Sequence, residues 1–212
     1  MDSKKSQRLL IALIPQKEIV AKLNKIRKIA GIKARKTSGL RTPHITIVDN
    51  SFSDIKKVDK ELSKIAKSLT SFNAMVKGLD TFIVKKSLRI EKYKQNNSLI
   101  YRIEGNSQLK NLRKEILKRL DYLKTSERLK QWIKENPEIS SKSIKNIEKY
   151  GTPFKDWEFH ATIGLIPKQK QGEILNKIKK LDLQKSWKID CFGLFIRKDG
   201  WKLYKKYNFT RI

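Results

Sequence analysis

The sequence predicts an α+β fold with two similar lobes, each formed by a mainly antiparallel sheet flanked by helices. Three observations predict it. A His-x-Thr motif occurs twice, at His44 and His160, and each copy lies in a strand-like stretch. Each of these stretches is followed by a helical pattern and then by further strands, so the order of elements repeats. The chain has 212 residues, which is long enough to bury a core as one large domain or as two small lobes.

Apolar spacing and turn residues assign the elements of the first half. Helices are expected where apolar residues recur every three or four positions, and strands where β-branched residues cluster. The expected elements are a buried strand at 8–14, a helix at 18–30 that Gly31 ends, a basic loop at 33–42, the first motif strand at about 44–49, a helix that Ser53 or Asp54 caps and that reaches Leu69, one or two strands within 72–84, and a hairpin of 87–92 with 98–104 that turns at 95–97.

The second half repeats this order after a polar interruption at 122–158. That segment is expected either to cap the cleft between the lobes or to decorate one lobe. The expected elements are a helix that Ser107 caps and that reaches Leu120, short helices at about 126–135 and 141–149, a turn at 151–153, the second motif strand at about 158–165, a helix around 174–181, and a final hairpin of 187–196 with 201–209 that turns at 198–200.

The two motifs use both histidines of the chain, and each histidine is followed two places on by threonine. Threonine occupies 9 of 212 positions, so two histidines would both acquire it by chance about (9/212)² of the time, roughly one in five hundred. Residues i and i+2 of a strand point to the same face. We therefore expect His44 to share a face with Thr46, and His160 with Thr162.

Charge is the feature of the composition that most restricts function. The chain has 50 Lys and Arg against 21 Asp and Glu, a net charge of +29. This balance favours a polyanionic partner, most simply nucleic acid. Only 11 of the basic residues are Arg and 39 are Lys, so a biased amino-acid composition with solvated lysines is the alternative explanation.

Cysteine content and hydropathy predict a cytoplasmic protein without membrane association, and we separately expect a monomer. Cys191 is the only cysteine, so no disulfide can form within the chain, and we expect it to pack in a strand. The apolar run at 9–14 follows basic residues, but it is short, ends at Pro15 and lacks a small-residue cleavage site. We interpret it as a buried strand and not as a signal peptide. No later stretch reaches the length of a membrane span.

Two imidazoles and two hydroxyls form a complete set of groups for displacement at a phosphodiester without a metal. An imidazole with a pKa near 6.5 can act as base or acid at neutral pH, so one histidine would deprotonate the attacking group and the other would protonate the leaving oxygen. The threonine hydroxyls would bind the non-bridging phosphate oxygens. Which histidine is the base stays open at this stage.

Other interpretations of these residues explain less of the pattern. A single strand histidine is commonly structural, but two matching motifs that use every histidine are not expected by that explanation. A metal site needs more ligands than the two histidines, and Asp49 would point away from Thr46 in a regular strand. No motif surrounds Cys191 that would make it a nucleophile, and no glycine-rich phosphate loop occurs. We therefore expect neither a metal nor a cofactor.

The paired apolar-His-apolar-Thr strands resemble the two-histidine phosphoesterase superfamily, in particular its bacterial and archaeal 2′-5′ RNA ligase-like (LigT-like) branch. The stretch from Arg8 to Pro15 resembles the opening strand of that branch, and the stretch from Phe192 to Phe209 resembles its closing hairpin. The resemblance covers most of the chain in order. It implies one bilobal domain over 1–212 with pseudo-two-fold symmetry and a basic active-site cleft between the lobes.

The resemblance also implies an activity and a set of roles. It implies metal-free hydrolysis of RNA 2′,3′-cyclic phosphate ends to 2′-phosphates, and joining of a 5′-hydroxyl to such an end as a second activity. Carried over, His44 and His160 are the acid–base pair, and Thr46 and Thr162 bind the phosphate. RNA with a 2′,3′-cyclic phosphate end, such as a tRNA fragment, is the expected partner.

One position departs from the family pattern. The family often places a basic residue just after the second motif, where this chain has Gly164 and Leu165. Arg41 and Lys168 are candidates for the missing RNA contact, or are solvated charges.

Three functions remain in competition at the level of sequence. The first is an RNA-end 2′,3′-cyclic phosphodiesterase. The second is a phosphodiesterase acting on 2′-5′-linked oligonucleotides or on a small cyclic nucleotide, which the net charge of +29 disfavours mildly. The third is a non-catalytic RNA- or nucleotide-binding module on the same fold, which would not need an acid–base pair.

Overall fold

The computed structural model describes residues 6–32, 43–82, 95–152, 158–179, 181 and 185–210. Helices and strands alternate through these ranges much as the apolar spacing predicts. The elements are β1 (Gln7–Leu13), α1 (Lys17–Ile29), β2 (Ile45–Phe52), α2 (Ile55–Lys67), β3 (Phe72–Phe82), β4 (Asn96–Ile103), α3 (Ser107–Leu120), η2 (Asp121–Leu123), α4 (Glu127–Glu135), α5 (Ser141–Tyr150), β5 (His160–Pro167), η3 (Lys168–Lys170), α6 (Gln171–Lys179), β6 (Ser186–Ile189), β7 (Cys191–Arg197) and β8 (Trp201–Asn208).

The strands form one curled antiparallel sheet whose centre is a nearly symmetric junction. The strand order is β6-β3-β4-β5-β2-β1-β7-β8, and the motif strands β2 and β5 are its central neighbours. They are joined by a single residue pair, Ile45 with Ala161. The α+β prediction is confirmed, and the two expected sheets are the two four-stranded halves on either side of this pair. A two-fold operation at the junction exchanges β2 with β5 and β1 with β4.

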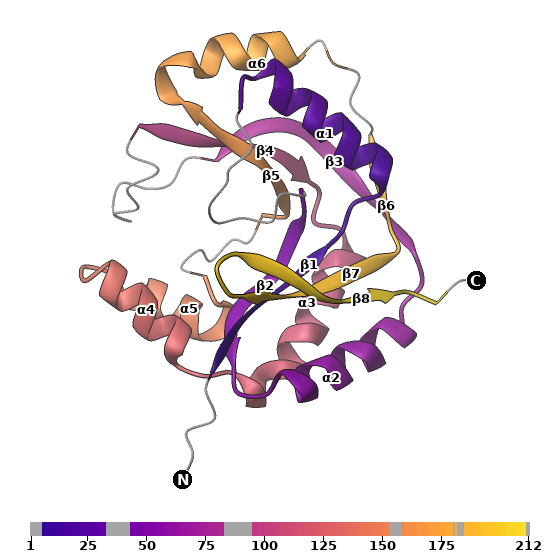
Figure 1. Ribbon diagram of the computed structural model, residues 1–212, viewed down its shortest axis with the longest axis vertical. Coiled ribbons are helices and arrows are strands. Elements are labelled where there is room, and N and C mark those ends of the chain that lie inside the picture. Colours follow the sequence, from indigo (N-terminus) through magenta and orange to yellow (C-terminus); the bar gives the residue numbers. More distant parts are fainter. Residues whose placement is uncertain are drawn as a thin grey trace.

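The helices cross over between the halves. Helix α1 follows β1 but packs against β5 and α6, whereas α3 follows β4 but packs against β2 and α2. Figure 1 shows α1 and α6 together at one end of the molecule and α2 and α3 at the other. Each motif strand is therefore backed by a helix that begins in the opposite half. This exchange packs elements of the two halves against each other.

Local capping explains where several helices begin and end. Asp54 caps α2 by accepting hydrogen bonds from the backbone of residues 56 and 57, as predicted. The cap of α3 is Asn106, one residue before the expected Ser107, and it accepts from the backbone of Leu109. Gly31 has a φ of 65° and ends α1 in a Schellman motif, in which the N–H of Ile32 donates to the carbonyl of Arg27.

Three strand predictions differ from the structure or lie outside it. Asn96 and Asn97 do not form a turn but begin β4, which pairs with β3 on one side and β5 on the other. The expected strand at 87–92 lies outside the described residues. The expected strand at 187–196 is broken at Asp190 into β6 and β7, which pair with β3 and β1 in opposite halves. The remaining strands, and the turn at 198–200, lie within a few residues of their predicted positions.

The described part of the polar segment, residues 122–152, forms α4 and α5, close to the two helices predicted. Both pack against β2. Gly151 ends α5 with a φ of 73°, and a Cβ atom there would collide with the backbone carbonyl of Asp49. Glycine is required because α5 ends directly against the motif strand. Helices α4 and α5 therefore belong to the half of the sheet that contains β2 and β1, and α5 ends against β2 at Asp49.

Apolar side chains from both halves share one main core. Its largest fully buried members include Trp187 and Tyr101, whose rings stack with centroids 5.1 Å apart. Among the described helices, none is both long and apolar enough to cross a bilayer.

Candidate active site

The motif side chains are gathered on one face of the sheet by the pair that joins its halves. Ile45 pairs with Ala161 in antiparallel register, and both side chains are fully buried in the main core. Because side chains alternate along a strand, the residues on either side of this pair point to the opposite face. All four histidine and threonine side chains of the motifs therefore lie on that face, at the centre of the molecule.

The antiparallel register also decides which motif residues are neighbours. The pair that joins the strands is Ile45 with Ala161, and in its antiparallel register Thr46 is on the side of His160 and His44 on the side of Thr162. Opposed residues in such a pair have Cα atoms about 4.5–5.5 Å apart. Each imidazole therefore lies on the same face as the threonine of its own motif, and this register directs it to the side of the threonine of the other motif. The four residues predicted from sequence flank the pair that joins the two halves of the sheet.

Local contacts fix the orientation and tautomer of His160. Its Nδ1 lies 2.8 Å from the backbone carbonyl oxygen of Glu158, which can only accept, so Nδ1 carries the hydrogen. The Nε2 atom of the neutral ring then carries the free lone pair. The ring of Phe82 stacks on the imidazole, with centroids 5.7 Å apart. Burial lowers the pKa of His160 below 6.5, against the hydrogen bond to Glu158, so the ring is neutral at pH 7.

Arg102 is a neighbour of His160 that the sequence analysis did not identify. It lies directly opposite His160 on β4, and its guanidinium pairs with Asp80 at 2.7 Å and with Glu158 at 2.9 Å. Its charge adds to the lowering of the His160 pKa. Arg102 therefore holds Glu158, which in turn orients the imidazole. No sequence motif marks this residue, because its role depends on strand register.

Two more arginines support the motif strands in corresponding places. Arg113 of α3 donates from Nε to the carbonyl of Ile47 at 3.3 Å, and Arg27 of α1 donates from Nε to the carbonyl of Ile163 at 2.6 Å. Ile47 and Ile163 each lie three residues after their motif histidine. These hydrogen bonds satisfy backbone carbonyls at the edges where β2 and β5 diverge. Burial lowers the pKa of Arg113 to about 10, so it remains charged at neutral pH.

An irregularity in β2 turns Asp49 toward the face that carries Thr46. The register with β1 shifts so that Thr46 opposes Ala12 while Asp49 opposes Leu10, which leaves one extra residue on β2. Asp49 accepts two hydrogen bonds from Arg8, at 2.8 and 2.7 Å. The expectation that Asp49 points away from Thr46 held only for a regular strand, and the structure corrects it.

The two candidate RNA contacts are not brought to the motif residues. Arg41 lies outside the described residues. Lys168 begins η3, after the last residue of β5, whereas His160 is the first residue of that strand. At a rise of about 3.3 Å per residue, Lys168 is about 25 Å along the strand from His160.

Neither a metal cluster nor an activated cysteine is evident in the part of the chain that the structure describes. Within those ranges, no three His, Cys, Asp or Glu side chains are grouped so that they would hold a metal ion. Cys191 is buried in β7, as predicted, and burial raises the pKa of its thiol to about 11. A protonated, buried thiol is a poor nucleophile.

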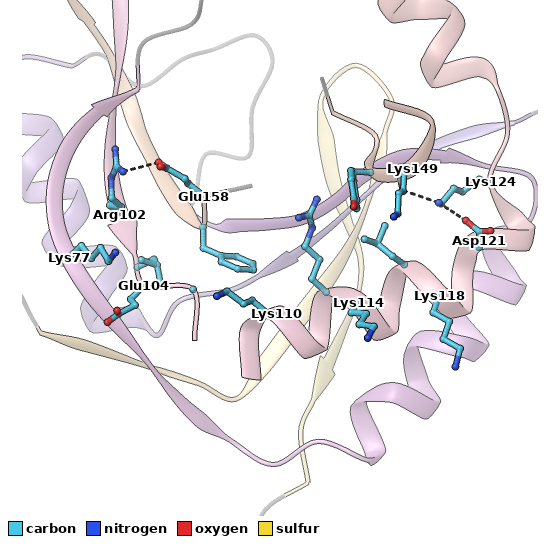
Figure 2. A pocket seen from close by; sticks show the side chains of 16 residues that line it. Lys77, Arg102, Glu104, Lys110, Lys114, Lys118, Asp121, Lys124, Lys149 and Glu158 are labelled. Atoms are coloured by element: carbon cyan, nitrogen blue, oxygen red, sulfur yellow. Dashed lines mark hydrogen bonds and ion pairs between the residues drawn. The ribbon is translucent and has the colours of Figure 1, made fainter. Parts of the chain in front are cut away.

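A basic pocket of about 950 Å³ begins beside His160 and follows helix α3. We call it the α3 pocket. Sixteen residues line it, of which eight are Lys or Arg and three are Asp or Glu (Figure 2). Arg102 and Glu158 form one end, and the end of α5 forms the other. Its lysines are Lys77, Lys110, Lys114, Lys118, Lys124 and Lys149.

The two-lobed antiparallel sheet with its central pair of motif strands is the fold of the LigT-like two-histidine phosphoesterases. The model of the 2′-5′ RNA ligase superfamily matches residues 15–201, and the chain belongs to this superfamily. This confirms the resemblance drawn from the motifs. No curated protein matches the sequence.

Solved structures agree with this assignment at the level of fold. The chain is similar to E. coli LigT in apo form, with 12% identity and a TM-score of 0.52 over 97% of this chain and 99% of that chain. It is similar to TT0787 of Thermus thermophilus, with 12% identity and a TM-score of 0.54 over 95% and 97%. It is also similar to E. coli LigT complexed with phosphate, with 13% identity and a TM-score of 0.51 over 97% and 99%.

Proposed function

We propose that this chain is a metal-independent phosphodiesterase that hydrolyses RNA 2′,3′-cyclic phosphate ends to 2′-phosphates. The family and fold indicate a phosphoesterase or 2′-5′ RNA ligase-like enzyme. The observation that carries the finer proposal is the register of Ile45 with Ala161, which gathers two imidazoles and two hydroxyls on one face. The net charge of +29 favours RNA over a small substrate.

In this proposal His160 is the general base. Its Nδ1 is occupied by the carbonyl of Glu158, and its lowered pKa leaves Nε2 unprotonated at pH 7. Nε2 takes a proton from the water that attacks the ring phosphorus. The bond from phosphorus to O3′ then breaks, and a protonated His44 gives its proton to O3′. The phosphate stays on O2′, which makes the product a 2′-phosphate.

Thr46 and Thr162 hold the phosphate between the imidazoles. In the register set by Ile45 and Ala161 each threonine faces the histidine of the other motif, and a phosphate hydrogen-bonded to both hydroxyls would be centred between base and acid. Fixed donors of this kind stabilise the charge that develops on the non-bridging oxygens. They also set the in-line geometry that displacement requires.

Ligation follows from the same arrangement. If the 5′-hydroxyl of another RNA replaces water, His160 deprotonates that hydroxyl and its oxygen bonds to phosphorus. The bond to O3′ breaks as before, which leaves a 2′-5′ linkage. We expect hydrolysis to dominate, because water is present at a far higher concentration than any RNA end.

A metal-free turnover assay tests this proposal. A short RNA ending in a 2′,3′-cyclic phosphate is incubated with the protein in EDTA, and products with the phosphate on O2′ or O3′ are separated. The proposal predicts conversion to the 2′-phosphate, lost in His44→Ala and in His160→Ala. Lys168→Ala is the matched control, since its side chain lies far from the motif residues, and it should turn over like the wild type.

The other outcomes distinguish the competing functions. Formation of the 3′-phosphate would contradict the assigned leaving oxygen. Turnover of 2′-5′-linked oligonucleotides or of a cyclic mononucleotide, but not of the RNA end, would support the second candidate function. Tight RNA binding without turnover of any of these would support a binding module. Full activity in either histidine variant would overturn the acid–base pair.

A further inference from the structure

The α3 pocket concentrates positive charge in a concave part of the surface. Its lining holds eight basic and three acidic residues, a net charge of +5. Among the described residues, no carboxylate forms an ion pair with Lys77, Lys110, Lys114 or Lys118. Unpaired ammonium groups held near one another around the pocket repel each other, so a bound polyanion would stabilise this arrangement.

The lysines of α3 form a regular row. Lys110, Lys114 and Lys118 are each four residues apart, so they lie on one face of the helix at intervals of about 6 Å. Figure 2 shows these three side chains following one another along α3. The opposite face of the helix carries Leu109, Leu112, Ile116 and Leu120 into the core. A row of cations at this interval matches successive phosphates of an extended single strand.

The far end of the pocket adds an aromatic ring between cations. The guanidinium of Arg113 lies 5.1 Å from the centroid of the Tyr150 ring, and Nζ of Lys149 lies 5.3 Å from it. Lys124 reaches the same end, where it pairs with Asp121 at 2.6 Å. Positive charge interleaved with aromatic rings is typical of single-stranded nucleic-acid sites.

The near end of the pocket is lined by two neighbours of His160, although none of the four motif residues lines the pocket itself. Glu158 lines the pocket with its side chain, while its carbonyl accepts the hydrogen bond from His160. Arg102 also lines it and lies opposite His160 in the sheet. An RNA strand that leaves the motif residues beside Arg102 and Glu158 would enter the pocket at this end.

We propose that the α3 pocket binds the sugar–phosphate backbone of single-stranded RNA on the 5′ side of the cyclic phosphate end. This inference rests on the proposed function for the position of that end. The pocket volume of about 950 Å³ is of the size that holds a small ligand or a short stretch of one strand, and not a duplex. The pocket therefore gives the enzyme its preference for an RNA chain over a cyclic mononucleotide.

Helix α2 offers a matched control for testing this proposal. Lys56, Lys60 and Lys64 repeat the spacing of the α3 row on an exposed face outside the pocket. The triple variants K110A/K114A/K118A and K56A/K60A/K64A remove the same charge from the same kind of helix. Alanine favours helix at these exposed positions, so both variants should fold, which circular dichroism checks.

Binding is measured with a single-stranded RNA that ends in a 3′-hydroxyl and so cannot react. At 0.1 M salt, K110A/K114A/K118A should bind at least about tenfold more weakly than the wild type. The slope of log affinity against log salt should become shallower by about 2, because each neutralised phosphate of a single strand contributes about 0.7. K56A/K60A/K64A should stay within about twofold of the wild type.

Turnover gives a second readout. We compare kcat/KM for an RNA oligomer with a cyclic phosphate end and kcat/KM for a cyclic mononucleotide. In K110A/K114A/K118A the first should fall relative to the second, mainly because KM for the oligomer rises. Equal losses of RNA affinity in the two triple variants, or no loss in either, would overturn the α3 pocket as the RNA site. Absence of turnover in the wild type would contradict the proposed function alone, since the binding comparison does not depend on it.

Discussion

The two halves of the sheet use the same devices around their motif strands but differ at the edges. In both halves, an arginine from a helix that begins in the other half donates to the carbonyl three residues after the motif histidine. Beyond Arg27, the edge of β5 is filled by Ile32, which packs against Gly164. Beyond Arg113, the edge of β2 opens into the α3 pocket.

Under the proposed function, this difference assigns catalysis and RNA binding to different parts of the sheet. The symmetric part of the molecule places one histidine and one threonine from each half at the junction, which suits the acid–base chemistry. The asymmetric part closes one edge with an apolar side chain and lines the other with lysines. A duplicated scaffold can thus keep its paired chemistry while one edge alone takes on substrate binding.

The largest expected effect is the loss of turnover when either motif histidine is removed from the junction. His44→Ala and His160→Ala should each lower kcat by about 10²–10⁴, the usual range for acid–base groups. The double variant should be little worse than either single variant, because the two groups act in one step. Steady-state kinetics on the cyclic phosphate RNA checks this. Multiplicative losses in the double variant would indicate that the histidines act independently.

The closed edge should be sensitive to one added methyl group. Gly164→Ala places a Cβ against Cγ2 of Ile32, and we expect the free energy of unfolding to fall by about 1–3 kcal/mol. Ile32→Ala in the same chain should restore part of it. Gly172→Ala, in α6 with open space around its Cα, should instead stabilise the protein by about 0.5–1 kcal/mol. Urea unfolding measures all three, and equal effects at the two glycines would contradict the packing described.

Arg27 and Arg113 should differ in how much each stabilises the fold. Arg27→Ala should cost about 1–2 kcal/mol of unfolding free energy, because its Nε donates to the carbonyl of Ile163 at 2.6 Å. Arg113→Ala should cost less, since its hydrogen bond is 3.3 Å long. Exposed Arg119 provides a control whose removal should change stability little. Urea unfolding would contradict this ranking if Arg113→Ala were the more damaging.

The smallest expected effect is a shift of the pH–rate profile, and it tests the assignment of His160 as the base. Since the base must be neutral and burial lowers the pKa of His160, kcat/KM should rise with pH along a limb centred below 6.5. Arg102 adds to that lowering, so Arg102→Gln should raise the pKa and move the limb to higher pH. Arg119→Gln should leave the limb in place. A limb that does not move in Arg102→Gln, or that moves to lower pH, would contradict the assignment.

Much of the fold follows from local patterns in the sequence. Helices α1, α2 and α3 lie close to their predicted ranges because helical periodicity depends only on near neighbours. The shared face of each His-x-Thr pair follows from strand alternation in the same way. The two buried residues between them, Ile45 and Ala161, confirm it.

The remaining features depend on contacts between distant residues, which local patterns do not contain. The break at Asp190 arises because β6 and β7 pair with strands of opposite halves. The irregularity that turns Asp49 toward Thr46 exists only in the register with β1. Arg102 and the α3 pocket appear once β4, β5 and α3 are packed together, and a lysine row on α3 is indistinguishable in sequence from the similar row on α2.

Nitrogen NMR of the two imidazoles tests the central claim most directly, since the chain contains no other histidine. Protein labelled with ¹⁵N-histidine is titrated with acid, and then with a 2′-phosphate mononucleotide. The account predicts that His160 keeps its hydrogen on Nδ1, titrates below 6.5, and that both imidazoles respond to the same bound phosphate. A hydrogen on Nε2 of neutral His160, or a response from only one of the two rings, would contradict it.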